Sequence, residues 1–376
     1  MKLLALIILA ALFSPGCKNK EAEKQFRAEA SEEASAGASA GASAKASIAV
    51  FIPGVMAGSA IYEMLAQGTQ KAAEDFARAN PAMANLAEAN PGAAPLVTVI
   101  EGGFNQAEWE SQVTTLAASG SYNLIVSSNP SLPDIVSGVS AKFPSQKFLL
   151  LDGELQGNPN VYTLRYNQRE QAYMAGYIAA LAAEEAAREG GVSGMAPGAE
   201  KSLGLVAAQE YPVMNSIILP GFIEGARAVD QAFNVDFRVV GNWFDAARAA
   251  ELAAAMIRGG VKVLLPIAGG AGHGVVQAAF EAGAKIVWFD TNGYAIRPGT
   301  VIGSAILRQD RAAYEKTMLF LEGRLPFGTA EIAGVADGFV DFVEDDPLYI
   351  SSVSQAIREK QAALIARLRT GELKLE

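Results

Sequence analysis

The sequence has very few of the side chains that bind transition metals or form disulfides. Among 376 residues it contains one cysteine, Cys17, and one histidine, His273. A zinc site of cysteine and histidine ligands needs several such side chains, and a disulfide needs two cysteines. These shortages exclude a Cys/His metal centre and a disulfide framework, and we expect neither a metal nor another cofactor.

Basic residues are also in short supply. Acidic residues outnumber them 40 to 30, which gives a formal net charge of −10 at pH 7. Nucleic acids and anionic lipid surfaces bind proteins through clustered Lys and Arg. We therefore expect no nucleic-acid partner. The one Gly-x-Ser-x-Gly match, residues 37–41, lies within the Ala/Ser/Gly repeats rather than between a strand and a helix, and no Ser-His-Asp arrangement is found, so no pattern indicates a serine hydrolase.

The first 16 residues have the features of a secretory signal peptide. Lys2 precedes an apolar run from Leu3 to Phe13, and small residues follow it. The run has 11 residues, whereas a transmembrane helix needs about 20. We predict that residues 1–16 are removed during export.

Cys17 ends this segment and resembles the lipidated cysteine of a bacterial lipobox, although Ser14 stands where that motif usually has leucine. An ordinary signal peptide with an incidental cysteine is the alternative. The Ala/Ser/Gly repeats after Glu33 contain no large apolar side chain, so they cannot form a core. We predict a lipid anchor at Cys17 and a flexible tether over residues 17–46.

From residue 47 onward, short runs rich in Val, Ile and Leu alternate with longer segments of helical periodicity. This alternation is typical of parallel sheets covered by helices. The expected strands cover residues 48–52, 96–100, 122–126, 147–151, 161–166, 203–207, 235–240, 261–267, 285–290, 301–305 and 331–335. The expected helices lie near residues 59–79, 104–118, 131–143, 168–188, 214–231, 245–258, 272–282, 310–323 and 350–370, and residues 190–197 form a loop. So many strands exceed one open sheet, and the chain is long enough for two cores, which predicts two doubly wound lobes.

Ligands of doubly wound sheets bind beyond the carboxyl ends of the strands. Asp152 and Asp290 follow two of the expected strands and can accept hydrogen bonds from sugar hydroxyls. Aromatic rings at such positions can sandwich a planar base at a small entropic cost. The rings near these strand ends are Tyr62, Phe104, Tyr166, Tyr211, Trp243 and Tyr294.

The motifs at these strand ends, taken in order, resemble the basic membrane protein family of ABC-transporter substrate-binding lipoproteins. The likeness covers the chain from residue 47 to the C-terminus. It is carried by Phe148-Leu149-Leu150-Leu151-Asp152, Pro159-Asn160-Val161, Gln171-Ala172-Tyr173-Met174-Ala175-Gly176-Tyr177, Gly221-Phe222-Ile223-Glu224-Gly225, Trp243-Phe244-Asp245, Ala268-Gly269-Gly270-Ala271-Gly272-His273-Gly274, Asp290 and Arg308.

The resemblance implies the α/β fold of type I periplasmic binding proteins, with two doubly wound lobes, a hinge and a central ligand cleft. The family includes purine-nucleoside receptors, in which aromatic rings hold the base and an aspartate after a late strand, here Asp290, holds the ribose. Arg308 stands where the family usually has a lysine, and Gly269 and Gly270 would bring the backbone close to the ligand. The family's first loop carries an asparagine that reads the base, and residues 58–63 have no counterpart of it.

We therefore predict a non-enzymatic substrate-binding lipoprotein of an ABC import system, anchored by lipid to the cell membrane and facing the periplasm or the cell exterior. Its partners would be an ABC permease in the membrane and a small polar solute, with a purine nucleoside favoured over a pentose, another sugar or an amine-like signal. One lobe would comprise residues 47–165 with part of 296–336, the other 166–295 with part of 337–376, with chain crossings near 165–167, 290–297 and 335–339. The predicted ligand-binding residues are Ser59, Tyr62, Asn129, Asp152, Tyr211, Trp243, Gly270, Asp290 and Arg308.

Two other classes of protein remain as alternatives. A nucleotide-dependent enzyme on the same fold is suggested by the glycines at 270, 272 and 274 after a strand, with Asp290 at the next strand end, although the spacing is Gly-x-Gly-x-Gly. A structural surface lipoprotein would share the anchor and the tether but would bind no ligand. Stabilisation of the protein by a ligand separates this class from a receptor.

Overall fold

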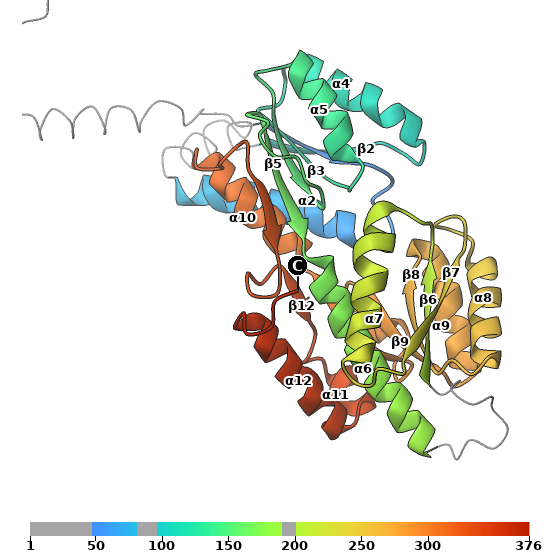
Figure 1. Ribbon diagram of the computed structural model, residues 1–376. Helices are drawn as coiled ribbons and strands as arrows, with labels where there is room; N and C mark the ends of the chain where they lie inside the picture. The colour runs from blue at the N-terminus through green and yellow to red at the C-terminus, as the bar shows by residue number, and fades with distance from the viewer. Residues whose placement is uncertain (1–46, 81–95, 190–200, 376) are drawn as a thin grey trace, which may run out of the picture. The chain divides into compact units, whose positions relative to one another are not determined.

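The computed structural model describes residues 47–80, 96–189 and 201–375. The predicted signal peptide, Cys17, the tether and the expected loop at 190–197 fall outside the described residues. Apolar strand runs alternate with amphipathic helices, and this pattern forms two separate sheets of six strands each (Figure 1).

The first sheet has the order β11-β5-β4-β3-β1-β2, and all its neighbouring strands are parallel. Its central strands are buried along their length, as near-continuous apolar runs predict. Its strands are β1 (Ser47–Ile52), β2 (Leu96–Glu101), β3 (Leu124–Ser128), β4 (Lys147–Leu151), β5 (Val161–Tyr166) and β11 (Ala330–Ala333).

The second sheet has the order β12-β10-β9-β8-β6-β7. Its neighbouring strands are parallel except β12, which pairs antiparallel to β10. Its strands are β6 (Ser202–Ala207), β7 (Asn234–Val239), β8 (Val263–Ile267), β9 (Lys285–Asp290), β10 (Val301–Leu307) and β12 (Val340–Phe342). The predicted α/β class with two doubly wound sheets is confirmed.

Helices of the described residues lie close to the predicted ranges. They are α2 (Ala60–Ala79), η1 (Gln106–Glu108), α4 (Trp109–Ala118), α5 (Leu132–Lys142), α6 (Gln168–Glu189), η3 (Met214–Ile218), α7 (Leu219–Arg227), α8 (Ala246–Arg258), η4 (Gly269–Ala271), α9 (Gly272–Glu281), η5 (Tyr294–Ile296), α10 (Gln309–Leu321), α11 (Pro347–Ser352) and α12 (Gln355–Arg369). No helix among these residues has both the length and the apolar composition needed to span a membrane.

Three segments carry the chain between the sheets. The chain leaves the first sheet after β5 and enters α6, which packs against α7 and β10, and it returns after β10 through α10, which packs against α2 (Figure 1). It leaves the first sheet again between β11 and β12. We expected the second crossing near residues 290–297. That expectation is wrong, because β10 pairs with β9 and keeps the chain in the second sheet until Leu307.

Two other differences have local physical causes. The expected helix over 350–370 is two helices, since Asp346 caps the first and Ser354 accepts a hydrogen bond from Ile357 N to begin the second. The expected helix over 214–231 begins with a π-helical turn, Met214–Ile218, and ends at Arg227. Strand β12 was not predicted, since three residues are too few to display an alternating pattern.

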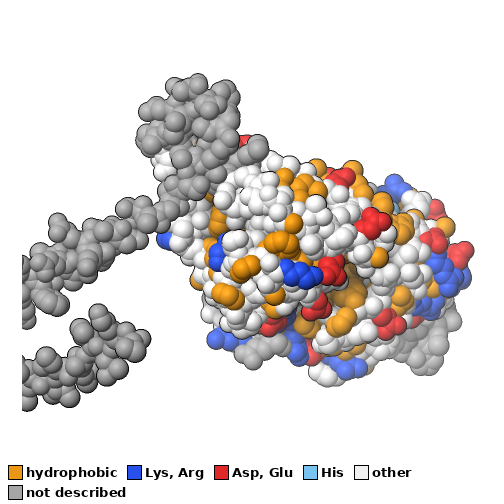
Figure 2. Space-filling model, turned by 90° about the horizontal axis from the view of Figure 1, so that it is seen from above, with side chains coloured by type: hydrophobic (Ala, Val, Ile, Leu, Met, Phe, Trp, Pro, Cys, Tyr) orange, Lys and Arg blue, Asp and Glu red, His pale blue; other side chains and the backbone are white. Residues whose placement is uncertain are grey.

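Charge is spread over the surface of the described residues rather than separated by sign. On the face in Figure 2, acidic and basic side chains are intermingled, with hydrophobic groups between them. Ion pairs one helical turn apart, such as Lys71 with Asp75 and Arg311 with Glu315, also occur among the described residues. This face offers no broad basic patch of the kind that binds nucleic acid.

Candidate functional site

Two aspartates stand at strand ends in an unusual backbone conformation. Asp152 directly follows β4 in the first sheet, and Asp290 is the last residue of β9 in the second. Their φ angles are 56° and 70°, and no other described non-glycine residue has a positive φ. A conformation of this kind costs about 1–3 kcal/mol and persists where the surrounding structure imposes it, often at ligand sites. Asp tolerates it better than most residues.

The surroundings of both carboxyl groups favour their neutral forms. Burial raises the pKa of Asp152 to about 7, and the charge of Asp290 adds to this effect while Arg165 opposes it. Burial also raises the pKa of Asp290 to about 6, against a hydrogen bond from Gln171 that lowers it. The charge of one aspartate acts on the other, so the ends of β4 and β9 face a common region.

Tyr62 and Asn129 extend the group around Asp152. The Tyr62 hydroxyl, from the first turn of α2, donates to the Pro53 carbonyl at 3.0 Å. Burial raises the pKa of Tyr62, the Asn129 amide lowers it through a hydrogen bond, and the charge of Asp152 raises it further. Asn129 follows β3 and accepts a hydrogen bond from Ser131 N at 2.9 Å. Three predicted residues are thus brought together at neighbouring strand ends.

Tyr211 and Trp243 form an aromatic pair beyond the second sheet. Their ring centroids are 6.4 Å apart, with an angle of 38° between the ring planes. The Trp243 indole donates to Gln209 Oε1 at 3.3 Å. Burial raises the pKa of Tyr211, and the charges of Asp290 and Asp152 raise it further, so this phenol lies near both carboxylates.

The glycine pair after β8 supports the Trp243 ring. Gly269 has φ +54°, and a Cβ atom there would lie 3.2 Å from Trp243 Cε3, whereas one at Gly270 would lie 3.5 Å from the Trp243 carbonyl oxygen. Ala271 N donates to the same oxygen at 3.0 Å. Gly269, more than the predicted Gly270, therefore permits the close packing of the indole on this loop.

Ser59 and Arg308 each stand at the N-cap position of a helix, Ser59 before α2 and Arg308 before α10. Ser59 occupies the N-cap position of α2 without a side-chain capping bond. The Arg308 side chain is 41% exposed and lies 3.5 Å from Asp310, Nε to Oδ1. It lines a surface pocket of about 440 Å³.

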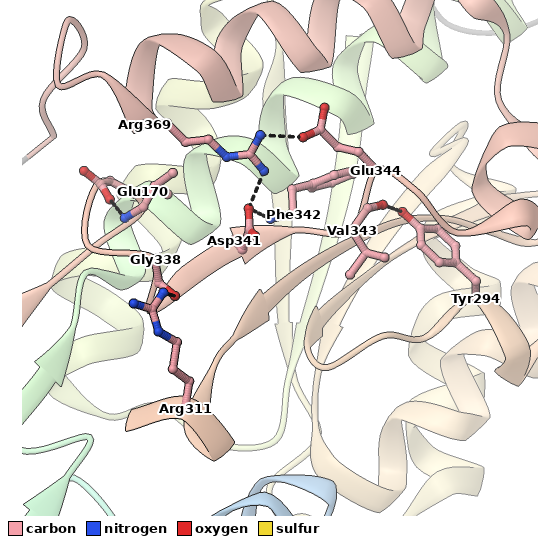
Figure 3. A network of polar contacts seen from close by, with 10 residues as sticks. Glu170, Tyr294, Arg311, Gly338, Asp341, Phe342, Val343, Glu344 and Arg369 are labelled. Carbon is pink, nitrogen blue, oxygen red and sulfur yellow. Dashed lines mark hydrogen bonds and ion pairs between the residues drawn. The ribbon is translucent and has the colours of Figure 1, made fainter. Parts of the chain in front are cut away.

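That pocket contains a separate ion-pair network. Arg369 bridges Asp341 at 2.8 Å and Glu344 at 3.0 Å (Figure 3). Both carboxylates and Arg369 line the pocket beside Arg308. Arg308 therefore faces charged groups that sequence analysis did not include in the ligand set.

Two of the rings predicted to face a ligand belong to the core instead. Tyr166 and Tyr294 are fully buried. The Tyr166 hydroxyl donates to Gln309 Oε1 at 2.5 Å, and the Tyr294 hydroxyl donates to the Val343 carbonyl at 2.8 Å. A ring that is closed off on both faces cannot stack on a base, so the expectation for these two tyrosines is wrong.

Two further residues make contacts that sequence analysis did not predict. Gln171 donates a hydrogen bond to Asp290 from 119 positions earlier in the chain, and its sequence motif marks only the family. Phe244 contacts Phe104 edge-to-face, with centroids 5.6 Å apart. Phe104 was found by its position after a strand, but periodicity gives no signal for its partner.

Comparison with known proteins identifies a family model and several relatives that match this chain. The family model described as ABC transporter substrate-binding protein PnrA-like matches residues 45–374. Basic membrane protein D of Borreliella burgdorferi is 26% identical over 61% of this chain and 64% of its own length. The ABC transporter nucleoside-binding protein BmpA of Lactococcus lactis is 28% identical over 42% of this chain and 40% of its own. The matched region thus spans less than two thirds of these curated relatives.

The fold is shared with solved structures. An ABC transporter system solute-binding protein from Aeropyrum pernix K1 superposes with a TM-score of 0.71 at 21% identity, over 88% of this chain and 93% of the other. At this level of identity the superposition establishes the common fold alone, which agrees with the predicted type I periplasmic-binding-protein class.

Proposed function

Because this chain belongs to the family of PnrA-like ABC transporter substrate-binding proteins, whose model matches residues 45–374, we propose that it captures a small polar solute for an ABC permease. A purine nucleoside is the favoured solute. The observation that carries this choice is the grouping of Asp152, Asp290 and the Tyr211–Trp243 pair, linked through the charges that act on Tyr211.

Each part of this group suits one part of a nucleoside. A carboxylate accepts both hydrogens of a cis-diol, and charge-assisted bonds of this kind are about twice as strong as neutral ones. Aromatic side chains at the rim of a site stack on a planar base. Asp290 is assigned to the ribose, Asp152 to donors on the base, and Tyr211, Trp243 and Tyr62 to the faces and edges of the ring system. Ser59, Asn129, Gly270 and Arg308 complete the proposed set.

The proposed mechanism is capture by hinged lobes, without chemical conversion of the ligand. The lobes would follow the two sheets, residues 47–165 and 166–295 with their later additions, and would rotate about the crossing segments. The fold and residue group support binding rather than catalysis. A structural surface lipoprotein remains the alternative if no small molecule binds.

The proposed location is the outer side of a membrane. The N-terminal signal pattern, Cys17 and the Ala/Ser/Gly repeats support export, a lipid anchor and a tether of residues 17–46. With this anchor, the receptor would stay close to the permease without a transmembrane helix of its own.

The test is the thermal midpoint of the protein with adenosine, guanosine, inosine, uridine, ribose, glucose and amino acids. A ligand at about 100 times its dissociation constant stabilises the native state by roughly 2.7 kcal/mol, which raises the midpoint by a few degrees. A shift with purine nucleosides alone, lost in Asp290→Ala, supports the proposal. A shift with sugars alone contradicts the stacking role of the rings, and no shift with any compound contradicts the receptor function.

A further inference from the structure

Gln171 is a fully buried side chain at a place where the chain passes between the sheets. It lies in the first turn of α6, just after the chain leaves the first sheet at the end of β5. Its backbone N–H donates to the Asn167 carbonyl, and the Asn167 N–H donates to Ala333 of β11. The start of α6 is therefore tied to the edge of the first sheet, while the helix packs against the second.

The side-chain amide of Gln171 donates two hydrogen bonds to acceptors in the second sheet. Nε2 donates to Asp290 Oδ1 at 3.1 Å and to the Ala305 carbonyl oxygen at 3.0 Å. A backbone carbonyl in β10 thus fixes the direction of the amide group, and the amide then holds one oxygen of the carboxylate. The second oxygen of Asp290 is left for another donor.

We propose that Gln171 is a positioning residue for ligand binding, which orients the Asp290 carboxylate toward the solute from the crossing between the two sheets. This inference rests on the proposed function, since it assigns Asp290 to the ligand. It adds a residue that contacts no ligand and acts only through the carboxylate.

A second buried contact strengthens the link between this site and the crossings. The Tyr166 hydroxyl, at the end of β5, donates to Gln309 Oε1, and Gln309 begins α10 just after the chain returns from β10. Tyr166 and Gln309 are fully buried, as is Gln171. Gln171, which holds Asp290, and the Tyr166–Gln309 pair thus lie at segments where the chain crosses between the sheets, about which the proposed rotation would occur.

The electrostatic surroundings make the role measurable. The ionisable groups whose charge couples to Asp290 are Asp152 after β4, Tyr166 in β5 and Tyr211 after β6. None of them is a cation, so the N–H of Gln171 is the group that favours the charged form of Asp290. Removal of this donor must raise the pKa of Asp290 above its value of about 6.

The test uses Gln171→Met, which keeps the length of the side chain and removes its donors. The matched control is Gln361→Met in α12. Gln361 is also fully buried, and its Nε2 also donates to a backbone carbonyl, that of Met174 in α6, but it has no contact with Asp290. Both substitutions remove a buried amide bonded to the same region of the protein, so a general loss of stability would appear in both.

The first measurement needs no ligand. The titration of the Asp290 carboxyl carbon is followed by carbon-13 NMR and assigned with Asp290→Asn. We expect the midpoint to move to higher pH in Gln171→Met and to stay in place in Gln361→Met. An unchanged midpoint in Gln171→Met overturns the inference. If Gln171→Met does not fold, Gln171→Asn, which shortens the reach of the amide, is titrated with the same criterion.

The second measurement is the affinity for adenosine by calorimetry as a function of pH. Gln171→Met should bind about three- to ten-fold more weakly at pH 8, with the acid-side loss of affinity beginning at higher pH than in the wild type. Equal affinities in wild type, Gln171→Met and Gln361→Met overturn the positioning role. If the wild type binds no nucleoside, the proposed function fails, while the ligand-free titration still decides whether Gln171 controls Asp290.

Discussion

At the scale of single residues, the candidate site depends on two carboxyl groups kept in strained and partly buried positions. Asp152 and Asp290 have positive φ angles at the ends of β4 and β9. In the free protein, no lysine or arginine among the residues described is hydrogen-bonded to either of them. A ligand with several hydrogen-bond donors replaces the lost hydration, which is the physical reason for a donor-rich solute.

The raised pKa values predict how the stability of the ligand-free protein depends on pH. Asp152, with a pKa of about 7, and Asp290, with a pKa of about 6, hold protons in the folded state that the unfolded chain releases near pH ~4. Their contribution to the free energy of unfolding is therefore complete below pH ~4 and is lost as the pH rises to 7.

We expect Asp152→Asn to have a higher thermal midpoint than the wild type at pH 8, by a few degrees, and to match it at pH 4. Differential scanning calorimetry between these pH values checks this. Asp134→Asn, on the exposed start of α5, is the control and should not flatten the dependence. A midpoint for Asp152→Asn that runs parallel to the wild type over the whole range would contradict the assigned pKa.

At the scale of elements, helices α2 and α10 pack against each other although they are far apart in the sequence. Gly68 in α2 lies against the backbone of Asp310, and a Cβ atom at Gly68 would also lie 2.9 Å from Ala313 Cβ. The absence of a side chain allows the two helices to approach at this point. The packing fixes the start of α10 and, with it, the crossing that follows β10.

The contact predicts opposite effects for two glycine substitutions in helices. Gly68→Ala should destabilise the protein by about 1–3 kcal/mol, since the added methyl group meets backbone that cannot move away. Gly138→Ala in α5, where a Cβ atom would meet nothing within 4 Å, should stabilise it by about 0.5–1 kcal/mol through helix propensity. Urea unfolding of both variants checks this. If both substitutions change the free energy of unfolding in the same direction, the proposed close approach is refuted.

At the scale of the whole molecule, the two sheets of the described residues are linked at one edge and are in contact at the other through Phe104 and Phe244. The crossings follow β5, β10 and β11, which lie at one edge of each sheet. Phe104 and Phe244 follow β2 and β7, the strands at the opposite edges. Their rings are 70% and 63% exposed, yet they contact each other, so this pair reports on the approach of the sheets far from the crossings.

A double-mutant cycle on these rings measures that approach. Edge-to-face pairs contribute about 0.5–1.5 kcal/mol beyond their burial. Phe104→Ala and Phe244→Ala should each destabilise the protein, and the double variant by less than their sum, as measured by urea unfolding. Phe280, 49% exposed on α9 and stacked with Arg297, supplies the control partner and should be additive with Phe104. Additive effects for Phe104 and Phe244 would mean that the rings do not meet in solution.

The sequence by itself determined the α/β class and the approximate positions of the described strands other than β12. Apolar runs and helical periodicity are local properties, and parallel strands expose their carboxyl ends at one edge, so Asp152, Asp290, Tyr211 and Trp243 could be predicted as strand-end residues from the sequence. Only the tertiary structure decided that β10 belongs to the second sheet, that Tyr166 and Tyr294 are buried, and that Gln171 holds Asp290. These outcomes depend on which strands pair, on which rings are covered, and on a contact between residues 119 positions apart. None of these leaves a periodic signal in the chain.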